Sequence, residues 1–194
     1  FFVFQVIGML TYSGGTLFNN GNAGYSFTRN FLSDLGRYAS FSMEHNFFSC
    51  QFFNMSLILA GGLFIMFYIN VRDIFVGYKY TYILFFGTAF GILGGISLIG
   101  VGLTPSDLYL SLHDFFAKWL FRCFFIASIC YSLVIYYSDI FDTKYALSYI
   151  LFAFSILFYI VISEFGPSPT ESELSLTFQV VAQKVILIIM FISI

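Results

Sequence analysis

Charged residues are scarce in this chain: Asp, Glu, Lys and Arg make up 9% of its 194 residues, whereas 59% are hydrophobic. Because a soluble domain carries about 25% charged residues, most of the surface is expected to face lipid. The formal net charge of −2 excludes the broad basic surface that proteins use to bind nucleic acid. No hydrophilic stretch is long enough for a second domain, so residues 1–194 are expected to form a single bundle.

Motifs that carry chemistry are also missing. The three cysteines, Cys50, Cys123 and Cys130, include no CxxC pair, so neither a disulfide framework nor a cysteine-rich metal site is indicated. No HExxH, GxSxG, Walker or dinucleotide-binding motif occurs. We therefore expect no cofactor and no bound metal. The alternative is that the two histidines, His45 and His113, hold a metal together with a neighbouring carboxylate.

Long apolar runs fill most of the sequence. A membrane-spanning helix needs about 20 predominantly apolar residues, and all but the first run reach roughly this length. The runs are residues 1–12, 47–69, 80–103, 115–137, 145–163 and 174–194. These runs predict an all-α fold: a polytopic transmembrane helical bundle of about six spans. The first run is too short to cross a bilayer, so we expect it to be the end of a truncated span.

Basic residues in the short loops predict the orientation of the bundle. Arg72 and Lys79 lie in loop 70–79, and Lys144 lies in loop 138–144. The loops predicted on the other side, 13–46, 104–114 and 164–173, are mainly acidic. Since positively charged loops stay inside, the 70–79 and 138–144 loops are predicted to be cytoplasmic and the long 13–46 segment non-cytoplasmic.

Two local patterns predict how parts of the bundle pack. Gly87, Gly91 and Gly95 recur at every fourth position of the 80–103 run. Small residues on one face let helix backbones approach closely, so this span is expected to be central. In the 13–46 segment, Ser33 and Gly36 are candidate ends of a short helix lying on the bundle.

Basic residues inside the apolar runs are the main indication of function. Asp114, Lys118 and Arg122 are spaced four residues apart and share one helix face, and Lys184 lies near the middle of the last run. A basic residue at the centre of a span costs about 2.5–3.5 kcal/mol, so such residues face the bundle interior or a wet cavity. Two hypotheses stay open. Either the cations pair with acids such as Asp34, Asp107 or Asp114, or they line a cavity for an anion such as a lipid phosphate.

Two short motifs give the chain a family resemblance. The sequence FLSDLG contains Ser33, Asp34 and Gly36, and GLTPSDLYLSLHDFFA contains Asp107 and His113. Their order and their position between apolar runs resemble the DUF998 family of six-span membrane proteins. More distantly, the chain is similar to the Frag1/DRAM/Sfk1 membrane proteins. Those relatives imply a link to lipid organisation, but the resemblance assigns no role to Arg122 or Lys184.

These patterns predict an integral membrane protein that binds or organises an anionic lipid or amphiphile in a polar, non-cytoplasmic cavity, without covalent chemistry. Its expected partners are membrane lipids, with no nucleic acid. The expected ligand-binding residues are Asp34, Asp107, His113, Asp114, Lys118, Arg122 and Lys184. One alternative is a membrane-embedded lipid hydrolase using His113 with Asp107 or Asp114. Another is an accessory subunit whose charged residues pair with a further membrane protein.

Overall fold

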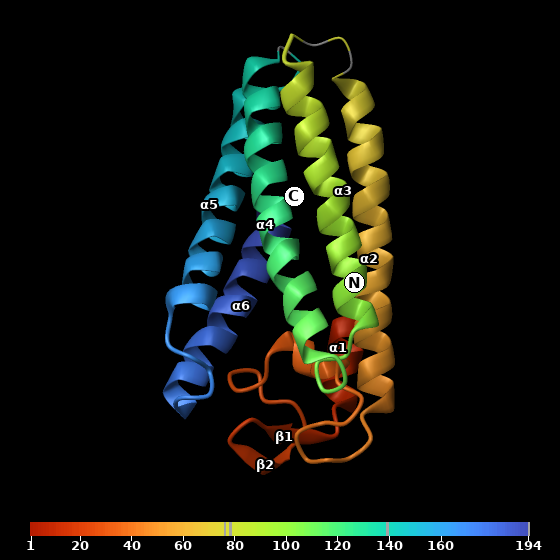
Figure 1. The fold of residues 1–194 in the computed structure, drawn as a ribbon, viewed down its shortest axis with the longest axis vertical. Helices are drawn as coiled ribbons and strands as arrows, with labels where there is room; N and C mark the ends of the chain where they lie inside the picture. The colour runs from red at the N-terminus through yellow and green to blue at the C-terminus, as the bar shows by residue number, and fades with distance from the viewer. Residues whose placement is uncertain (76, 78, 139, 194) are drawn as a thin grey trace.

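The computed structural model describes residues 1–75, 77, 79–138 and 140–193, which form an elongated helical bundle with a non-helical segment at one end (Figure 1). The elements, in chain order, are α1 (Phe2–Thr11), β1 (Gly14–Thr16), β2 (Asn19–Ala23), the 3-10 helix η1 (Leu32–Gly36), α2 (Phe47–Ile74), α3 (Thr81–Leu103), α4 (Leu110–Tyr137), α5 (Thr143–Phe165) and α6 (Glu173–Ser193). The predicted all-α bundle is confirmed, and each apolar run coincides with a helix.

Helices α2, α3, α4 and α5 are long and apolar enough to cross a membrane, by length and composition. Helix α1 is a shorter apolar helix, and α6 has 21 residues. Helices α2 and α4 exceed their predicted spans by five residues each, because α2 continues to Ile74 and α4 begins at Leu110, and α5 extends by two residues at each end. Three residues of the predicted cytoplasmic loops, 76, 78 and 139, lie outside the described residues.

Helix α3 is the central helix, packed between α2 and α4. A Cβ atom at Gly95 would lie 2.8 Å from the carbonyl O of Gly61 on α2, and one at Gly91 would meet the ring of Tyr68. On the other side, a Cβ at Gly87 would lie 2.6 Å from the Cβ of Cys130 on α4. The glycine pattern therefore correctly predicted a close helix contact, and the structure adds that the glycines serve two neighbouring helices.

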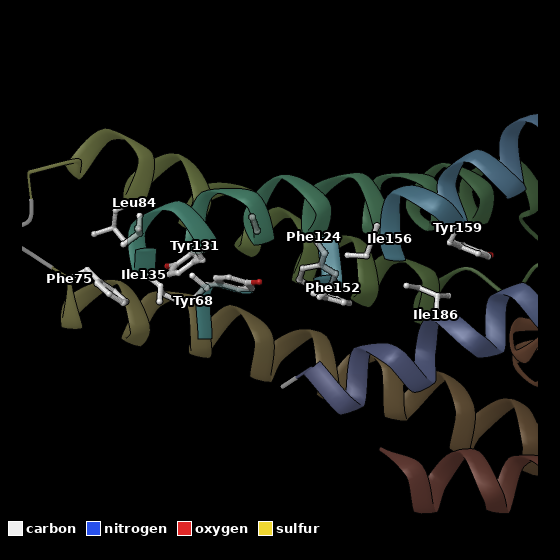
Figure 2. Packing of buried hydrophobic residues seen from close by; sticks show 13 residues of the cluster. Tyr68, Phe75, Leu84, Phe124, Tyr131, Ile135, Phe152, Ile156, Tyr159 and Ile186 are labelled. Carbon is white, nitrogen blue, oxygen red and sulfur yellow. The ribbon is translucent and has the colours of Figure 1, made fainter. Parts of the chain in front are cut away.

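Two groups of buried apolar side chains form the core. The larger group joins α2, α3, α4, α5 and α6, and includes Tyr68, Leu84, Phe124 and Ile156 (Figure 2). The smaller group lies near the N-terminal segment and contains Tyr12, Leu35, Phe53, Leu57, Leu98 and Val101. Leu35 of η1 is fully buried there, so the N-terminal segment is part of the hydrophobic core.

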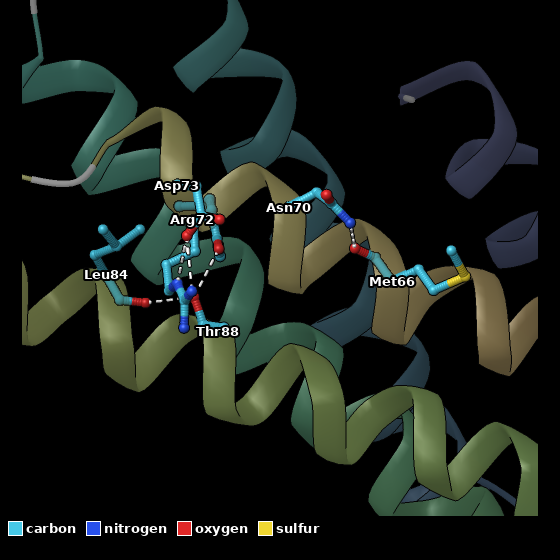
Figure 3. A network of polar contacts seen from close by, with 7 residues as sticks. Met66, Asn70, Arg72, Asp73, Leu84 and Thr88 are labelled. Carbon is cyan, nitrogen blue, oxygen red and sulfur yellow. Dashed lines mark hydrogen bonds and ion pairs between the residues drawn. The ribbon is translucent and has the colours of Figure 1, made fainter.

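A different polar arrangement occupies the end of the bundle near the α2–α3 connection. Arg72 pairs with its neighbour Asp73 at 2.7 Å, and Thr88 donates to the carbonyl O of Leu84 at 2.9 Å (Figure 3). Thr88 also shares a 2.8 Å hydrogen bond with the hydroxyl of Tyr131. Arg72 is therefore neutralised at the end of its own helix.

Residues 13–46, which we call the cap, form an ordered structure over the end of the bundle (Figure 1). Strands β1 and β2 pair antiparallel, a hairpin that the sequence did not predict. Gly15 has a φ of +83°, and a Cβ there would lie 2.3 Å from the backbone N of Ser42. Only glycine fits this close approach. The short helix predicted on the bundle is confirmed as η1, a 3-10 helix of five residues.

Candidate functional site

Asp34 stabilises the turn in which it lies. Its Oδ2 accepts hydrogen bonds from the backbone N of Phe31 at 2.8 Å and from Nδ2 of Asn30 at 3.3 Å. The residue preceding η1 is Phe31, so Ser33 is not the N-cap that the sequence suggested. The carboxylate at the third position of the turn satisfies a free backbone N–H, as acidic side chains commonly do at helix starts.

Asn30 is the central residue of the polar network in the cap and is completely buried. Its Nδ2 also donates to the carbonyl O of Gly15 at 3.0 Å, and its Oδ1 accepts from the backbone N of Ser26 at 2.9 Å. Its carbonyl O accepts from the hydroxyl of Tyr25 at 3.0 Å. Asn30 therefore joins the hairpin, the following loop and η1 through one side chain and one carbonyl group.

Lys184 joins α6 to this network. Its Nζ donates to the carbonyl O of Asn30 at 2.6 Å and lies 4.9 Å from the centre of the Phe27 ring and 5.4 Å from that of Tyr25. The residue is only 4% exposed. A buried ammonium needs such partners, and a carbonyl dipole with two aromatic faces supplies them without a direct ion pair.

The electrostatics of the network centre on Asp34. Burial raises the pKa of the Asp34 carboxyl from 3.8 to about 6, because a low-dielectric environment disfavours the charged form. The hydrogen bonds from Asn30 and Phe31 and the positive charges of Arg37 and Lys184 oppose this shift. These opposing contacts are weaker than the effect of burial, so the pKa of the Asp34 carboxyl stays above its ordinary value.

Helices α2 and α6 and the α3–α4 turn bind the C-terminal half of the cap. Asn46 and Asn54 donate side-chain hydrogen bonds to the carbonyl groups of Leu35 and Gly36, at 3.1 and 3.2 Å. Gln183 of α6 accepts from the backbone N of Leu32 at 2.8 Å. Asp107, in the α3–α4 turn, accepts from the backbone N of Tyr38 at 3.0 Å and of Ala39 at 2.9 Å.

The two motifs of the family resemblance therefore meet, although through different atoms than expected. The two motifs predict that Asp34 lies close to His113 or to the Asp107 turn, because nearby donors stabilise a carboxylate at a membrane surface. Asp107 instead binds the backbone just after η1, whereas Asp34 binds within the cap. Both carboxylates hold the cap in place, and both are occupied by N–H donors.

His113 lies in the first turns of α4 and is 6% exposed. Its Nδ1 lies 2.7 Å from the carbonyl O of Thr104, so this nitrogen carries the proton and Nε2 is the acceptor in the neutral ring. Nε2 has no hydrogen-bond partner among the described residues. His45 is exposed and its ring packs against Tyr38. Within the described part of the chain, no group of three potential metal ligands is found.

The other predicted site residues of α4 lie outside this network. Arg122 forms an ion pair with Glu164 of α5, an acid that the sequence placed only in a loop. Asp114 and Lys118 are exposed, and neither forms an ion pair within the described residues. The expectation that Lys118, Arg122 and Lys184 face one cavity is wrong, because each meets a different environment.

A cavity of about 410 Å³ lies among the helices of the bundle, bounded by α1, α2, α3, α4, α5, α6 and η1. Its walls are largely apolar, and Phe124, Phe152 and Ile186, drawn in Figure 2, contribute from three helices. The polar residues that line it toward the cap are Gln5, Ser33, His113 and Gln183. None of the three predicted cations lines this cavity, so it is not the cation-lined site that the charge pattern suggested.

The fold and this cavity define a polytopic α-helical membrane protein with a structured cap at one end of its bundle. The family described as "Protein of unknown function (DUF998)" matches residues 6–191, and the chain belongs to this family. The match confirms the predicted DUF998 membership, but the more distant similarity to Frag1/DRAM/Sfk1 proteins is not shown by it. No curated protein and no solved structure matches the chain.

Several residues of the site were not predicted from the sequence. Asn30, Asn46 and Gln5 are polar residues without a motif, and their importance follows only from their burial and their contacts. Gln183 is adjacent to Lys184 in the last apolar run. A polar residue inside an apolar run is the one signal that pointed to Gln183, and Gln5 in the first run carries the same signal.

Proposed function

We propose that this protein binds a membrane lipid or a similar amphiphile, with the apolar tail in the cavity beneath the cap. The observation that carries the proposal is the cavity itself, about 410 Å³ in volume and lined by apolar side chains of several helices. Protein interiors contain few voids larger than a water molecule, and apolar walls favour an apolar ligand in a cavity of this size. A lipid chain is the most abundant such ligand in a membrane.

The geometry favours a ligand held by its apolar tail over the ligand suggested by the charge pattern, which would be held by its anionic group. Lys184 is engaged by Asn30, Arg122 by Glu164, and Lys118 is exposed. The predicted binding set thus divides: His113 lines the cavity, Asp34, Asp107 and Lys184 stabilise the cap, and the others lie on α4. From the basic loop residues Arg72, Lys79 and Lys144, we propose that the cap faces the non-cytoplasmic side.

The two alternatives have less structural support. A hydrolase would need a carboxylate to orient His113, but its Nδ1 binds a backbone carbonyl, and Asp107 is occupied by two N–H groups. An accessory subunit would use the exposed Asp114 and Lys118 to contact a further membrane protein. Incubation with lipid esters tests the first alternative, and co-purification from native membranes tests the second.

A cavity-filling variant tests the proposed function. Ala117 of α4 lines the cavity, so Ala117→Phe should lower the amount of bound amphiphile at least fivefold in native mass spectrometry of the purified protein. Leu112→Phe, on the exposed side of the same helix, should retain the wild-type amount. Ala60→Phe fills the cavity from α2 and replaces Ala117→Phe if that variant does not fold. Equal occupancy in all folded variants, or no bound amphiphile in the wild type, would contradict the proposal.

A further inference from the structure

The polar end of the cavity carries hydrogen-bond acceptors without partners. Gln5 of α1 is 4% exposed, lines the cavity, and its Oε1 is a buried acceptor without a hydrogen bond in the described part of the chain. Such groups are rare in folded proteins, because an unsatisfied buried polar atom has lost its water without a replacement. A bound molecule that donates to this oxygen would satisfy it.

The orientation of the Gln5 amide follows from its neighbours. Nε2 of Gln5 lies 2.6 Å from Oγ of Ser56, and Oγ of Ser56 donates its proton to the carbonyl O of Phe53 at 2.7 Å. Since the Ser56 proton is used there, Oγ accepts from Gln5, and this atom of Gln5 must be the NH₂ group. The atom without a partner is therefore an acceptor.

His113 supplies a second acceptor to the same cavity. Its Nδ1 donates to Thr104, so Nε2 of the neutral ring presents a lone pair and has no partner among the described residues. Ser33 of η1 also lines the cavity, and its hydroxyl can both donate and accept. Gln5, His113 and Ser33 thus offer two acceptors and one hydroxyl, and no lysine or arginine is among the described residues that line the cavity.

We infer that the ligand of this cavity is an uncharged amphiphile whose head group donates hydrogen bonds through hydroxyl groups, recognised by Oε1 of Gln5 and Nε2 of His113. This inference rests on the proposed function and specifies its ligand class. A hydroxyl head group donates to both acceptors and accepts from Ser33. An anionic head group would place its charge against two lone pairs in an apolar environment, without a cation to compensate it.

Three probes with one chain and different head groups test the inference. Oleyl alcohol donates a hydrogen bond, oleyl methyl ether does not, and oleyl phosphate is anionic. We expect the wild-type protein in neutral detergent to bind the alcohol about tenfold more tightly than the ether or the phosphate, measured by native mass spectrometry. Monoolein, tested beside the alcohol, distinguishes an acylglycerol source from a free long-chain alcohol: tighter binding of monoolein assigns a glycerol head group, and weaker binding assigns a single hydroxyl.

Two variants identify the atom responsible. Gln5→Met keeps the side-chain length but removes Oε1, and should reduce the preference for the alcohol over the ether to less than threefold. Thr11→Val changes an exposed polar side chain on the same helix, outside the cavity, and should retain the preference. If Gln5→Met does not fold, the probe series on the wild-type protein decides alone.

The outcomes separate this inference from the proposed function. Equal binding of alcohol and ether, lost in Ala117→Phe, would overturn the head-group inference and leave the proposed function intact. Tighter binding of the phosphate would overturn the inference in favour of an anionic ligand. No binding of any probe to the wild-type protein would overturn both.

Discussion

Nζ of Lys184 donates a hydrogen bond to the carbonyl O of Asn30 at 2.6 Å, between residues 154 positions apart in the chain. The contact joins the middle of α6 to the cap, and it replaces the acid or ligand phosphate that a buried lysine was expected to need. It also makes the position of the cap depend on α6, the helix that contributes Gln183 and Ile186 to the cavity.

Removal of the Lys184 ammonium should loosen the cap. We expect Lys184→Met, which keeps the apolar stem, to lower stability by about 1.5–3 kcal/mol, the range for hydrogen bonds to charged groups. The measurement is thermal unfolding in detergent, together with hydrogen exchange of residues 25–34, which should become faster. Lys144→Met is the control, because Lys144 and its partner Asp142 are both largely exposed. Unchanged exchange in Lys184→Met would contradict the role of this contact.

The stability of the cap should depend on pH through Asp34. Its pKa is 3.8 in the unfolded reference and about 6 when folded, so the folded state binds more protons between these values. The stabilisation from this group is fully present below pH 3.8 and is lost as the pH rises through about 6. The pKa difference of about 2 units corresponds to about 3 kcal/mol of unfolding free energy, at 1.36 kcal/mol per pKa unit.

Asp34→Asn isolates this effect, since the amide oxygen can still accept from Phe31. The variant should lose the fall in melting temperature that the wild type shows between pH 4 and pH 7. Parallel pH profiles of the two proteins would show that Asp34 does not titrate in this range.

A methyl group at Gly95 should disrupt the contact between α2 and α3. Its Cβ would lie 2.8 Å from the carbonyl O of Gly61 and 2.7 Å from the side chain of Ile65, and a backbone carbonyl cannot move aside. We expect Gly95→Ala to destabilise the protein by about 1–3 kcal/mol. Gly62→Ala meets open space and should be neutral or slightly stabilising. Equal melting temperatures for the two variants would argue against this packing.

The ion pair between Arg122 and Glu164 should contribute modestly, since both side chains are about a third exposed. Arg122→Ala should lower stability by about 1 kcal/mol without changing the bound amphiphile, and Glu164→Gln should have a similar effect. In the double variant the two losses should be less than additive. Loss of amphiphile in Arg122→Ala with unchanged stability would restore the anion-binding role considered for this residue.

The helices were predictable because lipid is the solvent. A backbone N–H or C=O in hydrocarbon must be paired within its own helix, so runs such as 80–103 and 145–163 determine their secondary structure locally. The spacing of Gly87, Gly91 and Gly95 likewise predicted a close helix contact, although the structure divides the three glycines between α2 and α4. The β-hairpin and η1 were harder to predict, because short polar segments draw their stability from contacts elsewhere.

The partners of the charged residues were decided only by the tertiary structure. The sequence by itself determined the helical bundle, the central position of α3 and the requirement that Lys184 be compensated, since these follow from local periodicity and the cost of burying charge. It did not determine that Asn30 compensates Lys184, that Glu164 pairs with Arg122, or that Gln5 and His113 line one cavity. Each of these contacts joins separate helices or joins a helix to the cap. The choice among many possible polar partners is made when the helices pack.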